Sequence, residues 1–137
     1  MSNVIGKMLL YLPFDYIHCF QIENSISLYM NIIVRRAILY YADKYPSAKN
    51  ALLVWYNEFL KQNFDSFNEL KAVYGNASIV GSNRVIFNIK GNDYRLIVSV
   101  NFNQHAAYVI WFGTHREYDR INVETVSFDT KILTYKA

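Results

Sequence analysis

The residues best suited to chemistry lie in the second half of the chain. Arg84, Asn88, Lys90 and Arg95 are followed by the segment 113–119, which reads Gly-Thr-His-Arg-Glu-Tyr-Asp. If this segment turns helically, its histidine, tyrosine and final aspartate share one side, because residues three and four apart are neighbours on a helix. Guanidinium and ammonium groups bind anions, so composition and spacing indicate an anion-binding face.

Each of these residues also has a common structural explanation. A single cation on an exposed strand face is usually just solvated, His115 suits a helix cap or a core position, and Tyr118 suits a core aromatic position. Taken one at a time, these explanations are the more frequent ones. The convergence of cations, a histidine and a tyrosine at the end of one sheet is less easily explained in this way, but composition and spacing alone lead no further than an anion-binding face.

Several other chemistries lack their motifs. His18, His105 and His115 show no metal-ligand spacing, and Cys19 is the only cysteine, so neither a zinc site nor an intramolecular disulfide is expected. The chain has no glycine-rich phosphate loop and no Gly-x-Ser-x-Gly elbow. We therefore expect no metal and no cofactor. Cys19 is interpreted as a small buried apolar residue, which suits a reducing compartment.

Length and composition predict one folded domain. The chain has 137 residues, of which 53% are hydrophobic and 17% aromatic, and its net charge is +3. These values allow a packed core without staples and are compatible with an RNA-binding face without requiring one. No apolar run is long enough to cross a bilayer, and Pro13 and Asp15 interrupt the apolar stretch near the N-terminus. We expect a cytoplasmic protein without membrane association.

The first half predicts helices. Residues 32–34 are β-branched and suit a short strand, and residues 35–45 suit a helix that Pro46 closes. Ser47 is expected to cap a second helix. The apolar residues of that helix recur at three- and four-residue steps and form one stripe. They are Leu52, Trp55, Tyr56, Phe59 and Leu60.

A third, short helix is expected to begin at Ser66. Ser66 and Glu69 have the spacing of a capping box, in which each residue satisfies a backbone N–H near the helix start. Phe67, Leu70 and Tyr74 would form its inner edge. Gly75 is a natural terminator.

From residue 84 onward the apolar period changes from helical to alternating. Strands are predicted over residues 84–90, 94–101 and 106–112, with a hairpin at Gly91-Asn92. The resulting register pairs apolar residues with apolar residues and polar residues with polar residues. The pairs are Ile89 with Tyr94, Phe87 with Leu96, Val85 with Val98, Asn88 with Arg95 and Arg84 with Ser99. The predicted fold is α+β, with N-terminal helices packed on an antiparallel β-sheet meander and a short C-terminal helical turn.

Residues 1–29 differ from the rest of the chain, since they are apolar and aromatic without a clear helical or strand period. Met30 opens a segment that resembles the start of a domain. We interpret 1–29 as an N-terminal extension, 30–126 as the domain and 127–137 as a C-terminal tail. An extra strand or helix that packs on the domain is the alternative for residues 1–29.

Several joined motifs resemble the HigB toxin family. They are the stretch 77–92, Tyr94-Arg95-Leu96, the segment from Phe112 to Asp119, and the helix around Ala51, Trp55 and Tyr56 preceded by Tyr45-Pro46. The resemblance covers about residues 30–126 in continuous order with its spacing intact. Joined motifs at matching spacing are a stronger signal than one short motif.

The resemblance implies a RelE-like fold and an mRNA endonuclease that often acts on ribosome-bound message. It also implies a partner antitoxin of the HigA kind with a helix-turn-helix domain. The residues that correspond to catalytic positions are His115, Tyr118, Arg95, Arg84 and Lys90. Those expected to bind RNA are Lys71, Asn88 and Arg116.

The implied reaction needs no metal, because the RNA's own 2′-hydroxyl can attack the neighbouring phosphate. A base takes the 2′-proton, an acid protonates the leaving oxygen, and cations hold the added charge. His115 suits acid or base work, and the residues do not separate the two roles. One departure is Ile110, where members of the family often have a basic residue. It keeps two alternatives open: a degenerate toxin that binds RNA or a partner without cutting, and a purely structural domain.

Overall fold

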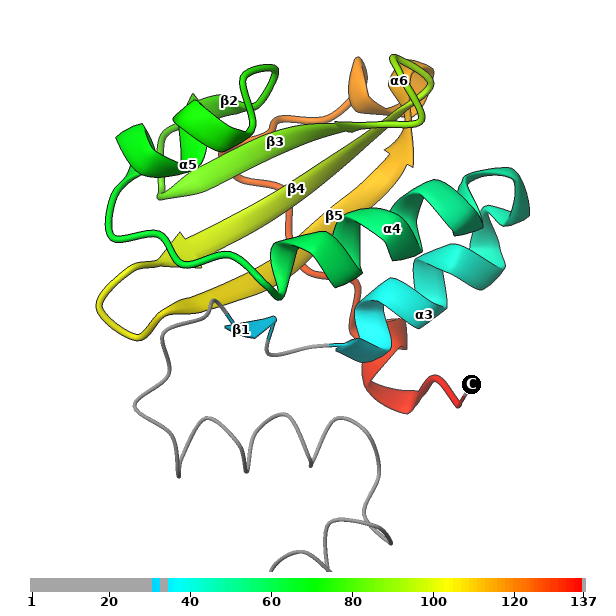
Figure 1. Cartoon of the computed structure of the whole chain (residues 1–137). Coiled ribbons are helices and arrows are strands. Elements are labelled where there is room, and N and C mark those ends of the chain that lie inside the picture. Colours follow the sequence, from blue (N-terminus) through cyan, green and yellow to red (C-terminus); the bar gives the residue numbers. More distant parts are fainter. Residues whose placement is uncertain (1–30, 33–34, 137) are drawn as a thin grey trace, which may run out of the picture.

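An antiparallel sheet forms one layer of the molecule, and helices α3 and α4 lie across one of its faces (Figure 1). The computed structural model describes residues 31–32 and 35–136. The predicted extension 1–29, Cys19 and the end of the predicted strand 32–34 lie outside the described residues. The separate helical and strand segments confirm the α+β class.

The elements follow one another in a simple order. They are β1 (Asn31–Ile32), α3 (Arg35–Lys44), the 3-10 turn η1 (Pro46–Ala48), α4 (Lys49–Phe59), α5 (Phe67–Val73), β2 (Ser78–Val80), β3 (Arg84–Ile89), β4 (Tyr94–Asn101), β5 (Ala106–Thr114), α6 (His115–Tyr118) and η2 (Thr130–Thr134). The short helical turn predicted after the third strand of the meander is α6.

The strand order is β1-β5-β4-β3-β2. Strands β2 to β5 form the antiparallel meander, and β1 runs parallel to β5 at the far edge. All five predicted pairs between β3 and β4 are present. The alternation of apolar residues predicted this register because a slip of one residue would turn the apolar face toward water. Strand β2 was not predicted, since its three residues show no alternating burial.

The helical layer follows the predicted stripe. Leu52, Trp55, Tyr56 and Phe59 of α4 are buried against the sheet. Helix α3 ends at Lys44, as expected from the position of Pro46. The prediction that Ser47 caps α4 is wrong: Pro46 starts η1 instead, and Ala48 occupies the cap position without a side-chain hydrogen bond.

Helix α5 begins as predicted, with one difference at its cap. The Ser66 hydroxyl accepts a hydrogen bond from the Glu69 N–H at 3.2 Å, which confirms Ser66 as the N-cap. The Glu69 carboxylate reaches one residue further back than a capping box requires and accepts from the Asp65 N–H at 2.7 Å. Gly75 follows the helix in a turn that leads to β2.

The face of the sheet that lies opposite helices α3 and α4 is partly covered by the chain itself. Ile86 and Ile97 alternate with the core-facing residues of β3 and β4, so the strand pattern puts them on the face with Arg84 and Arg95, yet both are buried. The chain after α6 runs behind the sheet toward η2 (Figure 1, orange to red). Arg84 ties this segment down by donating to its backbone carbonyls. Further on, Ile132 of η2 is fully buried in the main core, so part of the predicted tail packs into the folded unit. The domain boundary predicted after residue 126 stays a prediction.

Candidate functional site

The short helix α6 places His115 and Tyr118 at the end of β5. Thr114 is its N-cap: its hydroxyl accepts from the Glu117 N–H at 3.2 Å, while the Glu117 carboxylate accepts from the Thr114 N–H at 3.2 Å. This reciprocal pair is a capping box. The His115 N–H also donates to the Asp93 carbonyl at 2.9 Å. A single helical turn that would be marginal by itself is therefore fixed to the start of β4.

Glu117 also joins α6 to the helical layer. Its second carboxylate oxygen accepts from the Tyr45 hydroxyl at 2.8 Å. Burial would raise the pKa of Glu117, but the hydrogen bonds from Tyr45 and Thr114 outweigh it and hold the pKa below its ordinary 4.5. The carboxylate therefore stays charged at neutral pH and anchors α6 from two directions.

An aromatic cluster supports this junction from the core. Tyr94 stacks on Phe112 with ring centroids 5.4 Å apart, and Tyr45 packs edge-on against both rings. The Tyr94 hydroxyl meets the Ser47 hydroxyl at 2.5 Å. Such edge and offset contacts fix ring orientation as well as burying area. The ends of β4 and β5 that bear the candidate residues are thus held rigidly.

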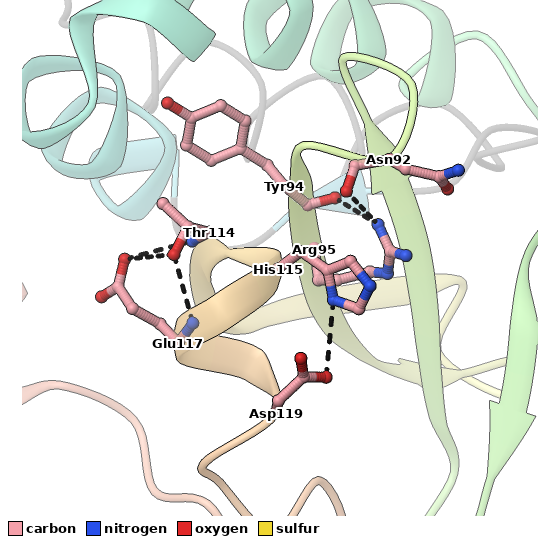
Figure 2. Close-up of polar contacts among 7 residues, drawn as sticks. All are labelled: Asn92, Tyr94, Arg95, Thr114, His115, Glu117 and Asp119. Atoms are coloured by element: carbon pink, nitrogen blue, oxygen red, sulfur yellow. Dashed lines mark hydrogen bonds and ion pairs between the residues drawn. The ribbon is translucent and has the colours of Figure 1, made fainter.

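Arg95, His115 and Tyr118 come together at this end of the sheet. The Arg95 guanidinium carbon lies 5.9 Å from the Tyr118 ring centroid, and the His115 and Tyr118 rings are 6.3 Å apart. His115 Nδ1 lies 3.5 Å from a carboxylate oxygen of Asp119 (Figure 2). The predicted helical spacing therefore does bring the three together. The arrangement combines a cation, an imidazole and a phenol within the reach of one small group.

Arg95 is oriented by hydrogen bonds to nearby backbone carbonyls, and these bonds use only some of its N–H donors. Its Nη1 donates to the carbonyls of Asn92 and Tyr94, each at 3.1 Å (Figure 2). A guanidinium carries five N–H donors, so donors remain for an anion while the plane of the group is fixed. The side chain is half-buried. A cation oriented in this way suits transition-state stabilisation, which depends on groups that need not reorganise.

The neighbouring cations lie around a shared hollow of about 560 Å³. It is lined by Lys90 and Asn92 of the β3–β4 turn, by His115 and Arg116 of α6, and by Ser47, Asp93, Tyr94 and Thr114. Lys90 was expected on the strand face; the structure corrects this, because β3 ends at Ile89 and Lys90 adopts a left-handed φ of 54° in the turn. Asn88 is exposed on β3 directly opposite Arg95.

Arg84 and Lys71 lie away from this site. Arg84 pairs with Ser99, at the other end of β4 from Arg95, and its Nη1 donates to the carbonyls of Val123 and Val126 at 2.7 and 2.9 Å. Lys71 Nζ donates to the carbonyls of Gly75, at 2.7 Å, and Ala77. In the described structure both side chains bind backbone carbonyls, and neither joins the group around His115.

The structure adds Trp111, which the sequence pattern did not single out. Residues 110 and 111 form a β-bulge, since Ile97 pairs with Trp111 and Val98 with Val109. A Cβ built on Gly113 would lie 2.7 Å from the indole ring, so the ring crosses the strand where only glycine leaves room. The indole lies 6.4 Å from Tyr118. A glycine inside a strand was the available signal, because it often marks such a close approach.

The described part of the chain carries neither a metal-binding cluster nor a membrane-spanning helix. No group of three or more His, Cys, Asp or Glu side chains there is placed to share a metal ion. None of the described helices has both the length and the apolar character needed to span a bilayer.

Comparison with known proteins identifies the family to which this fold belongs. The family model of the HigB toxin, described as the RelE-like toxic component of a toxin–antitoxin system, matches residues 48–121. That range contains the sheet meander, α6 and the candidate residues. The fold and site therefore define a RelE-like toxin domain.

Three curated relatives are also similar to this chain. They are the mRNA interferase toxin HigB of Escherichia coli strain K12 and the mRNA interferases HigB of Escherichia coli O157:H7 and Shigella flexneri; each is 32% identical over 92 residues, which cover 66% of this chain and 88% of the relative. This chain belongs to the HigB toxin family.

Proposed function

We propose that this protein is a metal-independent endoribonuclease that cleaves mRNA as the toxin of a toxin–antitoxin pair. The observation that carries the proposal is the convergence of Arg95, His115 and Tyr118 at one end of the sheet. The curated relatives are named mRNA interferases, and this convergence supplies the residue types that such a reaction needs. Membership of the family gives the toxin role, and the site gives the mechanism that we infer.

The reaction is an attack of the RNA's 2′-oxygen on the adjacent phosphorus. A base accepts the 2′-proton, the bond to the 5′-oxygen breaks, and an acid returns a proton to that oxygen. His115 is exposed and lies beside Asp119, so it can exchange protons with a bound strand and be oriented by the carboxylate. Tyr118 is the second candidate for proton transfer. Arg95 faces the phosphate and stabilises the charge that develops on it.

The remaining cations would position the strand rather than react. Lys90 and Arg116 flank the hollow beside His115, where phosphates of neighbouring nucleotides can be held by long-range attraction. Asn88, opposite Arg95, can donate to phosphate or sugar oxygens. Arg84 and Lys71 are not assigned roles on RNA, because their side chains bind carbonyls of this chain.

Analysis of the product ends tests the mechanism. Cleavage by the 2′-oxygen leaves a 2′,3′-cyclic phosphate on one fragment and a 5′-hydroxyl on the other, and a chelator leaves the rate unchanged. Message is incubated with the purified protein alone and with translating ribosomes, because we also propose that the message is cut on the ribosome. Chelator is added only to the reaction without ribosomes, since ribosomes themselves need Mg²⁺. Fragments with 5′-phosphate ends, or loss of activity with chelator, would contradict it.

A second candidate function is binding of RNA or a partner without cleavage. It is favoured by Ile110, which stands in the β-bulge beside Trp111 and lacks the charge that related toxins often carry there. Loss of one cation near a phosphate can weaken binding or turnover. Replacing Ile110 with Lys or Arg separates the two: a large gain in cleavage would mean that the native chain is a weakened enzyme, whereas tight RNA binding without cleavage in either form would favour the binding module.

The partner that we propose is a small antitoxin of the HigA kind with a helix-turn-helix domain. An active ribonuclease that cuts message would poison its own cell, so it requires an inhibitor. Co-expression of this chain with the adjacent gene should restore growth and give one co-purifying complex. Separate elution of the two proteins at low and at moderate salt would count against this partner.

A further inference from the structure

We infer that Trp111 is a stacking platform for a nucleobase next to the scissile phosphate. The inference rests on the proposed ribonuclease function and adds a base-binding subsite to the phosphate-binding group. Its starting point is the position of the side chain, which lies on the sheet face opposite helices α3 and α4. Trp111 pairs with Ile97, which is fully buried on this second face but lies outside the main core cluster. The indole is half-buried and is not among the side chains packed on that main cluster, so part of the ring remains exposed on this face.

A tryptophan that leaves the core calls for an explanation, because indoles contribute most to stability when they pack inside. The backbone accommodates this one in two ways. The β-bulge at Ile110 and Trp111 re-aims the side chain, as bulges near functional sites often do. Gly113 then provides the floor, since any side chain there would collide with the ring.

The groups around the indole match the chemistry of a nucleotide. Tyr118 lies 6.4 Å from it at an angle of 49°, and the Arg95 guanidinium lies 5.9 Å from the Tyr118 ring. Arg95 and Gly113 are direct partners across β4 and β5. One face of the sheet thus presents a flat aromatic surface next to an oriented cation. A base can stack on the first while its phosphate meets the second.

This subsite accepts single-stranded RNA, because a base must be unstacked to lie on an indole. Stacking on an aromatic ring is tolerant of sequence, since every base has a π-face. The platform therefore sets where the strand lies relative to His115, and it should affect binding more than the chemical step. Trp111→Leu is expected to weaken RNA binding about 5- to 150-fold, whereas Trp111→Phe should retain most of the affinity.

Intrinsic fluorescence reads the contact directly, because the chain has two tryptophans, Trp55 and Trp111. Trp55 is only 6% exposed in the core, so a bound base can reach only Trp111. The probe is a short single-stranded RNA with fluorine in place of every 2′-hydroxyl, which cannot be cleaved by 2′-attack. We expect it to quench the wild-type emission and to leave the emission of Trp111→Leu unchanged.

An abasic version of the same oligonucleotide is the matched ligand control, since it keeps the phosphates and removes the bases. It should bind wild type and Trp111→Leu with equal affinity and quench neither. Binding of the full probe without quenching, or equal affinity of the full probe for wild type and Trp111→Leu, would overturn the stacking platform while leaving the ribonuclease proposal intact. Absence of both RNA binding and cleavage in the wild type would overturn both. Thermal melting of each variant confirms that it is folded.

Discussion

The two arginines on the second face of the sheet differ in what surrounds them. Arg84 and Arg95 both lie on adjacent strands and belong to the same alternating pattern, and they occupy register positions four residues apart. At about 3.3 Å per residue this corresponds to roughly 13 Å. Around Arg84 the segment after α6 supplies backbone carbonyls. Around Arg95, helix α6 supplies a histidine and a tyrosine, and strand β5 supplies an indole.

This difference shows that two residues of the same type on one sheet face can have quite different surroundings. Both arginines donate to backbone carbonyls, but those around Arg84 come from a segment that is distant in sequence, while those around Arg95 belong to its own strand and turn. Arg84 therefore fastens a long connection to the sheet. Arg95 is oriented by local contacts and keeps donors for an external anion. One end of the face fastens the chain to the sheet, and the other carries the candidate site.

The largest expected effect lies at the site end, at His115. His115→Gln should lower the rate of RNA cleavage by about 100- to 10,000-fold if the imidazole transfers a proton in the transition state. Glutamine keeps similar size and polarity, so α6 should remain in place. The rate is measured on labelled message under single-turnover conditions. A loss of only a few-fold would mean that His115 merely occupies the first position of the helix.

The next effect in size is expected at Arg95. Arg95→Ala should lower cleavage by about 100- to 1000-fold, because it removes one preoriented charge-stabilising group. Its thermal midpoint should stay near that of the wild type, since the hydrogen bonds of the guanidinium go to local carbonyls and its contact with the Tyr118 ring lies at the surface. Arg95→Lys is the matched variant. It should recover part of the rate, because it restores the positive charge but not the planar guanidinium that can donate two parallel hydrogen bonds. Full activity in Arg95→Ala would remove the cation from the mechanism.

The contrast between the two arginines also marks the limit of prediction from sequence. The β3–β4 register was predictable because it depends on which side chains face the core, a property of local alternation. The environment of Arg84 was not, since it depends on where residues 123 and 126 pass after a long connection. No periodicity encodes that path.

The site shows the same division between local and non-local causes. The spacing of His115 and Tyr118 on one helical turn was predictable, and their proximity is confirmed by a ring separation of 6.3 Å. Lys90 was misplaced because the turn begins one residue earlier than the alternation indicates. Trp111 was missed because a bulge changes the direction of a side chain without an obvious mark in the pattern. The catalytic roles themselves stay predictions.

At the other end of the face, removing Arg84 should affect stability and leave the chemistry intact. Arg84→Ala eliminates two hydrogen bonds from a half-buried guanidinium, which should cost about 1–2 kcal/mol and lower the thermal midpoint by roughly 4–8 °C. Cleavage per folded molecule should stay within about two-fold, an effect smaller than any expected from charge stabilisation at the site.

Lys61→Ala removes an exposed cation just after α4 and is the control for loss of charge alone. It should change neither the thermal midpoint nor the rate of cleavage. The measurements are thermal melting and single-turnover cleavage well below the melting range. A loss of cleavage in Arg84→Ala comparable with that of Arg95→Ala, at unchanged stability, would show that both ends of the face bind RNA. The division of this face into a structural end and a functional end would then be wrong.

The smallest expected effect concerns the link between the site end and the helical layer, the hydrogen bond from Tyr45 to Glu117. Tyr45→Phe should cost about 0.5–1 kcal/mol of unfolding free energy near neutral pH, because it removes a half-exposed hydrogen bond to a charged group.

The pKa of Glu117 lies below its ordinary 4.5 in the folded protein, so its carboxylate contributes stability above that value and loses the contribution as pH falls through the folded pKa. The difference in unfolding free energy between wild type and Tyr45→Phe should therefore be greatest above pH 4.5 and shrink in more acidic solution. Tyr108→Phe is the matched control, since among the described residues the Tyr108 hydroxyl has a single long, exposed hydrogen bond of 3.4 Å, to Gln104. Chemical denaturation across this pH range measures both variants, and a Tyr45→Phe difference that stays constant with pH would show that the charge on Glu117 does not contribute to holding α6 in place.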